Sequence, residues 1–334
     1  MFRQPGFALR DPLPWADLVG IVAQAEALGY GAVFLPEIAG RDAVATLSAL
    51  AGETRHLLLG TGVLPMGSRT PMLTAMGAAT VHERSQGRFV LGIGAGPATA
   101  GALDRLRELV QALRRLLAGE TVELDGRRLW LSLQLRSPVP IWISALGPKA
   151  VRLAGEVADG VLLNWCTPER VSSAREQLAE GAAASGRDPS GVTVAVYVRA
   201  CFDDENEAAA LEALRTATGE YASFPAYARQ FAALGFGPEV EAAAKAHAAG
   251  RPQEVPEDLV RAICLTGDLE VARARLREFG DAGADLPILY PVMAAGAEPA
   301  RSILATLNAI APASFAPEHP AAPEHPAAPE HPSA

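Results

Sequence analysis

Histidine is scarce in this chain of 334 residues, and its scarcity excludes several kinds of active site. Only three of the six histidines, His56, His82 and His247, lie outside the C-terminal segment. None of them follows the carboxyl end of an expected strand, so neither a histidine metal centre nor a Ser-His-Asp triad is indicated. The chain also lacks a P-loop and a correctly placed G-x-G-x-x-G motif. We therefore predict no metal site and expect any chemistry to come from a bound cofactor.

Cysteines, basic clusters and long hydrophobic runs are also few or absent. The three cysteines (Cys166, Cys201 and Cys264) are odd in number and widely spaced, which argues against a disulfide framework and for a reducing compartment. With 38 acidic and 29 basic residues and no basic cluster, no nucleic-acid or anionic-membrane partner is expected. No apolar run is long enough to span a bilayer, and the N-terminal residues do not resemble a signal peptide. We expect a soluble, cytoplasmic protein.

What the sequence does contain is a regular alternation of strand and helix patterns. Apolar segments typical of buried strands are each followed by a helical pattern, at residues 7–9, 32–35, 57–63, 88–91, 141–144, 160–163, 192–200 and 286–290. Eight such units favour a single (β/α)8 TIM barrel, in the α/β class, over an open parallel sheet.

Two insertions and a tail depart from this alternation. Residues 121–130 alternate around an Asp-Gly pair, which predicts a hairpin, and residues 205–247 are alanine-rich and predict a helical insertion. After Pro312 a Pro-Glu-His repeat begins, which is typical of an extended, disordered tail. The predicted organisation is a barrel domain over residues 1–312 and a tail over residues 313–334. We expect the three histidines of the tail to be solvated rather than to bind a metal.

Three of the expected strands end in glycine-rich turns, at residues 60–65, 92–96 and 145–149. In a parallel α/β barrel the carboxyl ends of the strands form the face that carries the site. In the third turn, Pro148 is expected at the first position of a helix, so that free backbone N–H groups face this mouth. Gly147 would let a phosphate approach, and Lys149 would add a positive charge. The alternative is an ordinary strand-to-helix turn.

Polar residues at other strand ends are further candidates. Glu37 follows the second strand and could accept a hydrogen bond from a cofactor or substrate, unless it is simply an exposed loop acid. Asn164 and Thr167 follow the sixth strand and could bond a phosphate or a ring. The loop after the third strand, with Met66, Ser68 and Arg69, could line the same mouth. We interpret Trp165 and Cys166 as packing residues, and Arg152 and Arg199 as solvated or structural.

These segments resemble the bacterial luciferase-like family of flavin and deazaflavin oxidoreductases over about residues 5 to 311. The resemblance rests on Leu28–Glu37, Gly60–Val63, Ser85–Gly94 and Ala145–Lys149 with Ala158–Gly160, in the family's order. Within the family the pattern is most similar to members that use coenzyme F420, including proteins similar to methylenetetrahydromethanopterin reductase.

The resemblance implies a hydride transfer between carbon C5 of the deazaflavin and a small-molecule substrate. It implies that the ring lies against a bulge at Gly62 and Val63, where many relatives have a non-prolyl cis peptide bond, and that the cofactor phosphate meets residues 147–149. Glu37 is then the candidate catalytic residue, and relatives are commonly homodimers. The candidate cofactor-binding residues are Thr61, Gly62, Val63, Gly94, Ala145, Leu146, Gly147, Pro148, Lys149, Asn164 and Thr167.

Three features depart from the family pattern. Ile38 stands where many relatives have a histidine, which argues against a histidine-assisted proton transfer. The loop at residues 96–101 is short, and Gln86 replaces a common glycine, a change that we interpret as minor. Two alternatives therefore stay open: an FMN-dependent monooxygenase, and a non-catalytic barrel that binds a flavin, or a partner through its tail.

Overall fold

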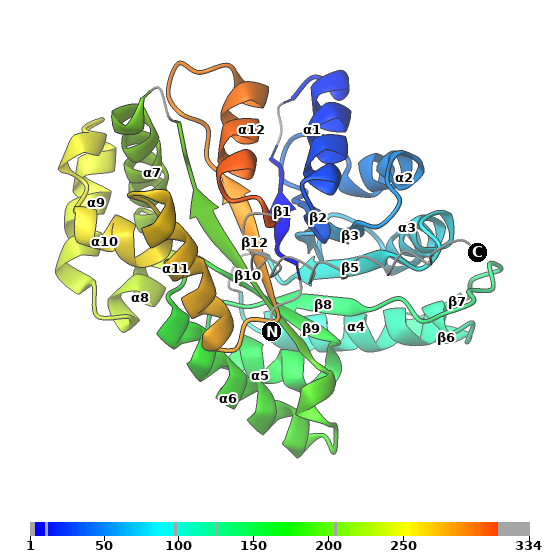
Figure 1. Ribbon diagram of the computed structural model, residues 1–334. Coiled ribbons are helices and arrows are strands. Elements are labelled where there is room, and N and C mark those ends of the chain that lie inside the picture. Colours follow the sequence, from blue (N-terminus) through cyan, green and yellow to red (C-terminus); the bar gives the residue numbers. More distant parts are fainter. Residues whose placement is uncertain (1–3, 11–12, 97–98, 125, 204–205, 313–334) are drawn as a thin grey trace, which may run out of the picture.

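The computed structural model describes residues 4–10, 13–96, 99–124, 126–203 and 206–312 (Figure 1). The predicted tail, residues 313–334, and part of the short loop, residues 97 and 98, lie outside these ranges. Eight parallel strands form a closed barrel, because the last strand pairs with both its predecessor and the first strand. They are β1 (Gly6–Ala8), β2 (Ala32–Leu35), β3 (Leu58–Thr61), β5 (Phe89–Gly94), β8 (Ile141–Ser144), β9 (Gly160–Asn164), β10 (Thr193–Ala200) and β12 (Leu286–Pro291). The predicted (β/α)8 barrel is confirmed.

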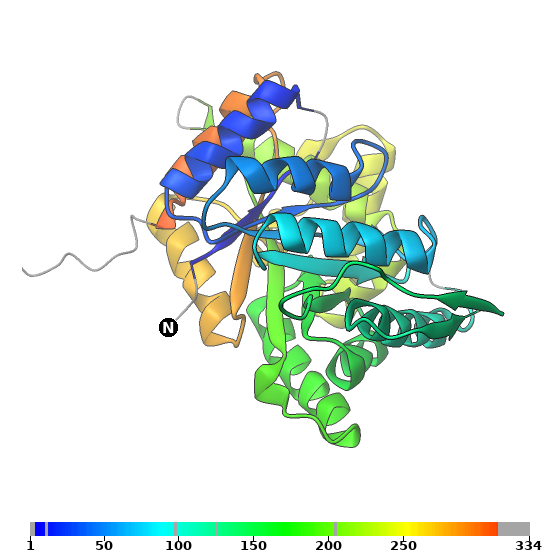
Figure 2. The ribbon, with the colours of Figure 1, turned by 90° about the vertical axis from the view of Figure 1, so that its right-hand side faces the viewer.

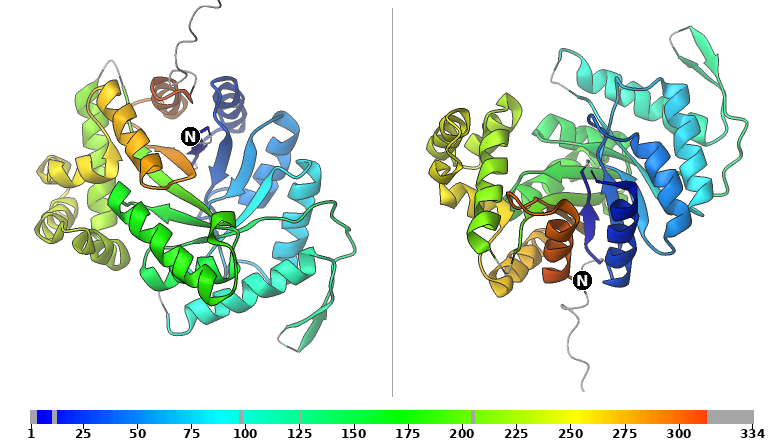
Figure 3. Two further views of the ribbon diagram at one scale, coloured as in Figure 1. Left: turned by 60° about the horizontal axis from the view of Figure 1, so that its bottom comes forward. Right: turned by 90° about the horizontal axis from the view of Figure 1, so that it is seen from above.

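Helices surround this barrel, as Figures 2 and 3 show from other sides. Those that connect successive barrel strands are α1 (Trp15–Ala27), α2 (Ala43–Glu53), α3 (Pro71–Arg84), α4 (Ala102–Leu117), α5 (Pro148–Val157), α6 (Pro168–Ala184) and α11 (Leu269–Asp281), and α12 (Pro299–Ala309) follows β12. None of the helices in the described ranges is long and apolar enough to cross a membrane.

Both predicted insertions are present, and they lie on opposite sides of the barrel (Figure 1). The hairpin consists of β6 (Val122–Leu124) and β7 (Arg127–Leu129), which pair antiparallel. The helical insertion consists of α7 (Glu207–Ala222), α8 (Pro225–Ala233), α9 (Gly237–Ala248) and α10 (Glu257–Ile263), followed by the short strand β11 (Cys264–Leu265). The insertion was predicted to end at residue 247 but continues through α10. This helix leads the chain back to the barrel, where β11 pairs with β10.

Local residues define several helix ends. The Asp42 carboxylate accepts a hydrogen bond from the Ala45 N–H at 2.8 Å and so caps α2. The Thr70 hydroxyl accepts one from the Leu73 N–H at 3.2 Å, and Pro71 occupies the first turn of α3. Gly29 ends α1 with φ 89°, a backbone conformation that favours glycine.

Large aromatic side chains fill part of the barrel interior, and they pack against glycines of the neighbouring strands. Phe34 and Trp142 stack with ring centroids 5.6 Å apart. A Cβ atom on Gly60 would lie 2.2 Å from the Phe34 ring, and one on Gly160 would lie 2.6 Å from the Trp142 ring. The barrel interior around these side chains is therefore a packed core, which leaves the mouth as the place for a ligand.

Gln86 is more than a minor departure from the family pattern. Its φ is 55°, in the left-handed region where a side chain strains the backbone and glycine does not. Gln86 is exposed and lies in the turn between α3 and β5. We expect Gln86→Gly to raise the free energy of unfolding by about 0.5–1 kcal/mol, although glycine also adds entropy to the unfolded chain. Chemical denaturation measures the change, and Gly87→Ala (φ 87°) should shift stability in the opposite direction.

Candidate active site

The strand register places a bulge at residues 61–63. Gly60 pairs with Val90, and Leu64, in the short strand β4 (Leu64–Pro65), pairs with Ile93. Between these two pairs the chain advances four residues from Gly60 to Leu64 but only three residues along β5. One extra residue therefore lies in the bulge. The peptide bond between Gly62 and Val63 is cis. The predicted bulge and its cis bond are confirmed.

Hydrogen bonds with the two neighbouring strands, β2 and β5, hold this bulge. The Thr61 hydroxyl is buried, donates to the carbonyl of Gly92 and accepts from its N–H, both at 2.8 Å. The Gly62 N–H donates to the Leu35 carbonyl at 2.8 Å, and the Glu37 N–H donates to the Val63 carbonyl at 3.4 Å. The backbone at the bulge is thus fixed in place on both sides.

Tyr197 of β10 supports the bulge from across the barrel. Its buried hydroxyl donates to the Gly62 carbonyl at 3.0 Å. A Cβ atom on Gly62 would lie only 1.7 Å from that hydroxyl oxygen. Burial raises the pKa of Tyr197 well above its usual range, so its hydroxyl stays protonated and remains a donor. Residue 62 must be glycine for this contact to exist.

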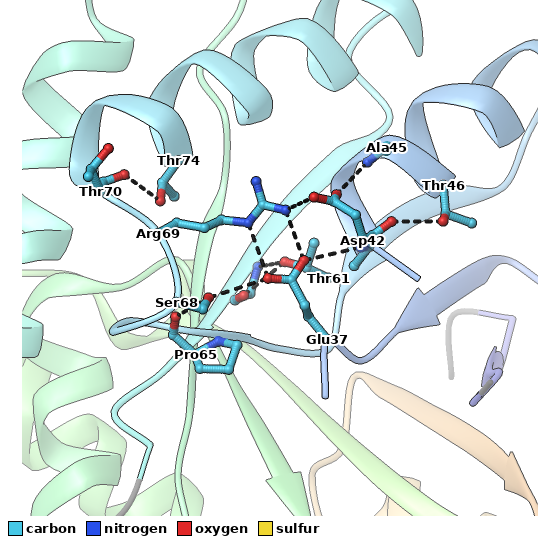
Figure 4. A network of polar contacts seen from close by, with 12 residues as sticks. Glu37, Asp42, Ala45, Thr46, Thr61, Pro65, Ser68, Arg69, Thr70 and Thr74 are labelled. Carbon is cyan, nitrogen blue, oxygen red and sulfur yellow. Dashed lines mark hydrogen bonds and ion pairs between the residues drawn. The ribbon is translucent and has the colours of Figure 1, made fainter. Parts of the chain in front are cut away.

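Glu37 lies at the centre of a polar network beside the bulge (Figure 4). Arg69 donates to both of its carboxylate oxygens, at 3.2 and 3.0 Å, and also pairs with Asp42. The Ala43 N–H and the Ser68 hydroxyl donate to the same carboxylate, at 3.1 and 3.3 Å. These contacts join the loop after β2, the start of α2 and the loop after β4. Glu37 is only 16% exposed, so the interpretation as an exposed loop acid is wrong.

Asp42 should contribute a pH-dependent part of the stability. Burial alone would raise the pKa of Asp42, but hydrogen bonds from the Ala45 N–H and from Arg69 outweigh it and hold the pKa below its usual value of 3.8. A carboxyl with a lowered pKa stabilises the fold above its unfolded pKa, and this contribution is lost as the pH falls through the folded value. Asp42→Asn keeps a capping side chain but removes the charge. Its cost should be about 0.5–1 kcal/mol at pH 7, because half the side chain is exposed. In denaturation at several pH values, the cost should shrink as the pH falls below the usual Asp pKa of 3.8.

The first turn of α5 is open at the mouth. Gly147 precedes Pro148 without a side-chain cap, and both are exposed. A Cβ atom on Gly147 would meet nothing within 4 Å. Lys149 is exposed in the same turn. An uncapped helix start with a nearby cation and free space is a suitable place for a phosphate.

Other candidate residues lie around this turn or deeper in the barrel. Ala145 is buried at the end of β8, and Gly94 ends β5 with its carbonyl bonded to the Met66 N–H at 2.9 Å. The Leu146 carbonyl accepts a hydrogen bond from the Arg170 guanidinium at 3.1 Å. The sequence analysis did not single out Arg170. Thr167 caps α6, accepting from the Arg170 N–H at 3.4 Å.

Asn164 faces the helical insertion and Arg199 rather than α5. Its amide nitrogen donates to the Tyr227 hydroxyl at 2.8 Å, and its amide oxygen accepts from Arg199. Arg199 is only 3% exposed, so it is not a solvated residue. Its guanidinium lies 4.3 Å from the Trp165 ring and 4.2 Å from the Tyr290 ring. By contrast, Arg152 forms an exposed ion pair with Glu180, as predicted.

Arg199 lines a cavity of about 250 Å³ at the mouth. The walls come from the ends of β1, β9, β10 and β12 and from α7. The cavity-lining residues used below are Arg10, Trp165, Arg199, Glu220 and Tyr290. The sequence did not predict this cavity, because one wall belongs to the helical insertion.

The three cysteines are free and buried, and burial raises the pKa of each thiol to about 12. They are therefore protonated at neutral pH.

Comparisons with known proteins agree with this architecture. A 5,10-methylenetetrahydromethanopterin reductase from Methanolobus tindarius is 39% identical over 199 residues, which are 55% of this chain and 60% of that protein. An F420-dependent glucose-6-phosphate dehydrogenase from Beutenbergia cavernae is 32% identical over 231 residues, which are 60% of this chain and 68% of that protein. The match thus spans about 60% of the length of the first relative.

Solved structures share the fold at lower identity. The F420-dependent tetrahydromethanopterin reductase from Methanopyrus kandleri superposes with a TM-score of 0.75 at 20% identity, over 91% of this chain and 96% of that one. An oxygenating constituent of 3,6-diketocamphane monooxygenase from Pseudomonas putida, in complex with FMN, gives 0.65 at 18% identity, over 93% of this chain and 97% of that one. The family model for luciferase-like monooxygenases matches residues 1–286. The chain therefore belongs to the luciferase-like monooxygenase family.

Proposed function

We propose that this protein is an F420-dependent oxidoreductase that transfers a hydride between carbon C5 of the deazaflavin and a small organic substrate. The observation that carries the proposal is the bulge at Gly62–Val63, held by Tyr197 and Thr61 and opening on the same mouth as the uncapped start of α5. Relatives whose names specify F420 dependence add support, since one matches this chain at 32% identity. A cytoplasmic location and assembly as a homodimer belong to the same proposal.

The residues present fit such a cofactor. The space beside Gly147 admits a phosphate, which the N–H groups of the first turn of α5 and the Lys149 ammonium would bind. The bulge offers a backbone surface without a large side chain at Gly62, against which Val63 and Gly94 would position a flat ring. Ala145, Leu146, Asn164 and Thr167 remain proposed members of this site.

In this proposal the protein contributes placement and polarity. Bound F420 would supply C5, a carbon that accepts or releases a hydride. Tyr197 keeps the Gly62 carbonyl in position, and the buried walls exclude water from the reacting face. Both carboxylate oxygens of Glu37 accept hydrogen bonds from Arg69. We therefore propose that Glu37 acts by positioning Arg69 and the adjoining loops. Ile38, which is 64% exposed, provides no group for proton transfer.

FMN is the second candidate cofactor, because the family model is named for monooxygenases and the Pseudomonas neighbour is in complex with FMN. Titration of the purified protein with F420 and with FMN, followed by fluorescence, tests the choice. We expect F420 to bind at micromolar concentration and FMN at least tenfold more weakly. Tighter binding of FMN would favour the monooxygenase, and no binding of either would leave only the non-catalytic barrel that binds a partner through its tail.

A further inference from the structure

We propose that the cavity beside Arg199 binds the substrate through a carboxylate, so that the substrates are small organic monocarboxylates. The inference rests on the function proposed above and names its substrate class. It is carried by a buried arginine, its aromatic surroundings and the charges that line the cavity.

Arg199 is a buried cation without an acidic partner. No Asp or Glu oxygen in the described ranges lies within 4 Å of its guanidinium, which donates instead to the neutral amide of Asn164. The guanidinium carbon lies over the rings of Trp165 and Tyr290, 4.3 and 4.2 Å from their centroids. These cation–π contacts offset part of the cost of burial, but they supply no oxygen acceptor to the N–H groups at the edge of the guanidinium. A carboxylate matches that edge with two parallel hydrogen bonds.

The groups around Arg199 do not neutralise it at pH 7. Burial raises the pKa values of Tyr197, Tyr227 and Tyr290, so these hydroxyls are uncharged. The indole N–H of Trp165 is also buried and has no acceptor in the described part of the chain. Because buried polar groups are normally paired, an arginine and an indole N–H beside one cavity indicate a ligand with acceptor oxygens.

The remaining charges of the cavity favour a single negative charge on that ligand. Arg10 and Glu220 line the same cavity and carry opposite charges, which leaves the charge of Arg199 as the net positive one. A carboxylate complements it, whereas the second charge of a phosphate would meet Glu220 without an additional cation.

The cavity is adjacent to the proposed hydride-transfer site. Arg199 lies two residues beyond Tyr197 on β10, so both side chains point to the same face of the strand. The Tyr197 hydroxyl contacts the Gly62 carbonyl at 3.0 Å, and its ring lies 5.3 Å from the ring of Tyr290. A substrate anchored at Arg199 would thus lie next to the bulge. A cavity of about 250 Å³ limits it to a small molecule.

Three matched probes test the chemistry on the wild-type protein, with and without F420. Benzoate, benzamide and phenyl phosphate have similar size but differ in charge, and calorimetry measures their dissociation constants. We expect benzoate to bind at least tenfold more tightly than benzamide and also more tightly than phenyl phosphate. Equal binding of benzoate and benzamide, or no binding of benzoate, would overturn the inference. Preferential binding of phenyl phosphate would assign the cavity to phosphorylated substrates instead.

Variants assign the effect to the arginine. Arg199→Met should lose the preference for benzoate over benzamide, Arg199→Lys should keep part of it, and Glu220→Gln should strengthen phenyl phosphate binding. The control is Arg115→Met, which removes an exposed arginine of α4 that pairs with Glu120. This variant should bind all three probes like the wild type. If Arg199→Met does not fold, Glu220→Gln and the wild-type series still decide the matter. F420 titration of the same samples separates the two proposals, because benzoate binding without F420 binding would reject only the cofactor.

Discussion

Gly62→Ala should destabilise the protein by at least ~3 kcal/mol, and a second substitution, Tyr197→Phe, should restore at least half of that loss. The added methyl group would lie 1.7 Å from the Tyr197 hydroxyl oxygen, inside a packed barrel where neither group can move away. Removing the hydroxyl leaves the nearest other atoms at 3.1 and 3.2 Å, which is tight but tolerable.

A double-mutant cycle makes this prediction quantitative. Tyr197→Phe alone should cost about 1 kcal/mol, because the Gly62 carbonyl loses its hydrogen-bond donor. The coupling energy between the two positions should exceed about 1.5 kcal/mol in chemical denaturation. Gly67→Ala, where a Cβ atom would meet nothing within 4 Å, is the matched control and should change stability little. Additive effects of the two substitutions would show that the Tyr197 contact does not determine the residue at position 62.

The second large effect is a loss of F420 affinity at the start of α5, combined with a gain in stability. Gly147→Asp should raise the free energy of unfolding by about 0.5–1 kcal/mol, because aspartate caps a helix N-terminus and faces the positive end of its dipole. The same substitution should weaken F420 binding at least 100-fold, because its carboxylate would repel the cofactor phosphate. The two properties are expected to change in opposite directions, which a general loss of structure could not produce.

Gly147→Asn provides the control for this substitution. Asparagine caps a helix about as well as aspartate but carries no charge to face the dipole, so it should give a smaller gain, about a few tenths of a kcal/mol, with a smaller loss of affinity. Lys149→Ala should weaken binding by a smaller factor than Gly147→Asp and leave stability unchanged, since Lys149 is exposed. If Gly147→Asp binds F420 as tightly as wild type, the phosphate does not lie at the start of α5.

The backbone of the site could be predicted from the sequence because it depends on local signals. The bulge at Gly62 and Val63 was implied by the resemblance to the family, whereas glycines and a proline after an apolar strand indicated a strand end that carries a site, and Pro148 indicated the start of α5. The caps that Asp42 and Thr70 form at the starts of α2 and α3 are local in the same way. These features depend on neighbouring residues in the chain, so they can be recognised without knowledge of the fold.

The cavity could not be predicted, because it depends on contacts between distant segments. Tyr197 and Arg199 lie on the same face of an otherwise apolar strand, and this spacing was the one available signal for Arg199. Its aromatic neighbours come from β9, α7 and β12, which the barrel and the insertion bring together. The engagement of Glu37 by Arg69, 32 positions away in the sequence, is another long-range contact of this kind.

A structure of the protein with bound F420 tests the central claim most directly. The proposal predicts the deazaflavin ring in van der Waals contact with Gly62 and Val63, and the phosphate within hydrogen-bond distance of the backbone N–H of Lys149. It also predicts that the cavity at Arg199 stays open on the substrate side of the ring. A cofactor bound away from the bulge, or with its phosphate distant from α5, would contradict the account.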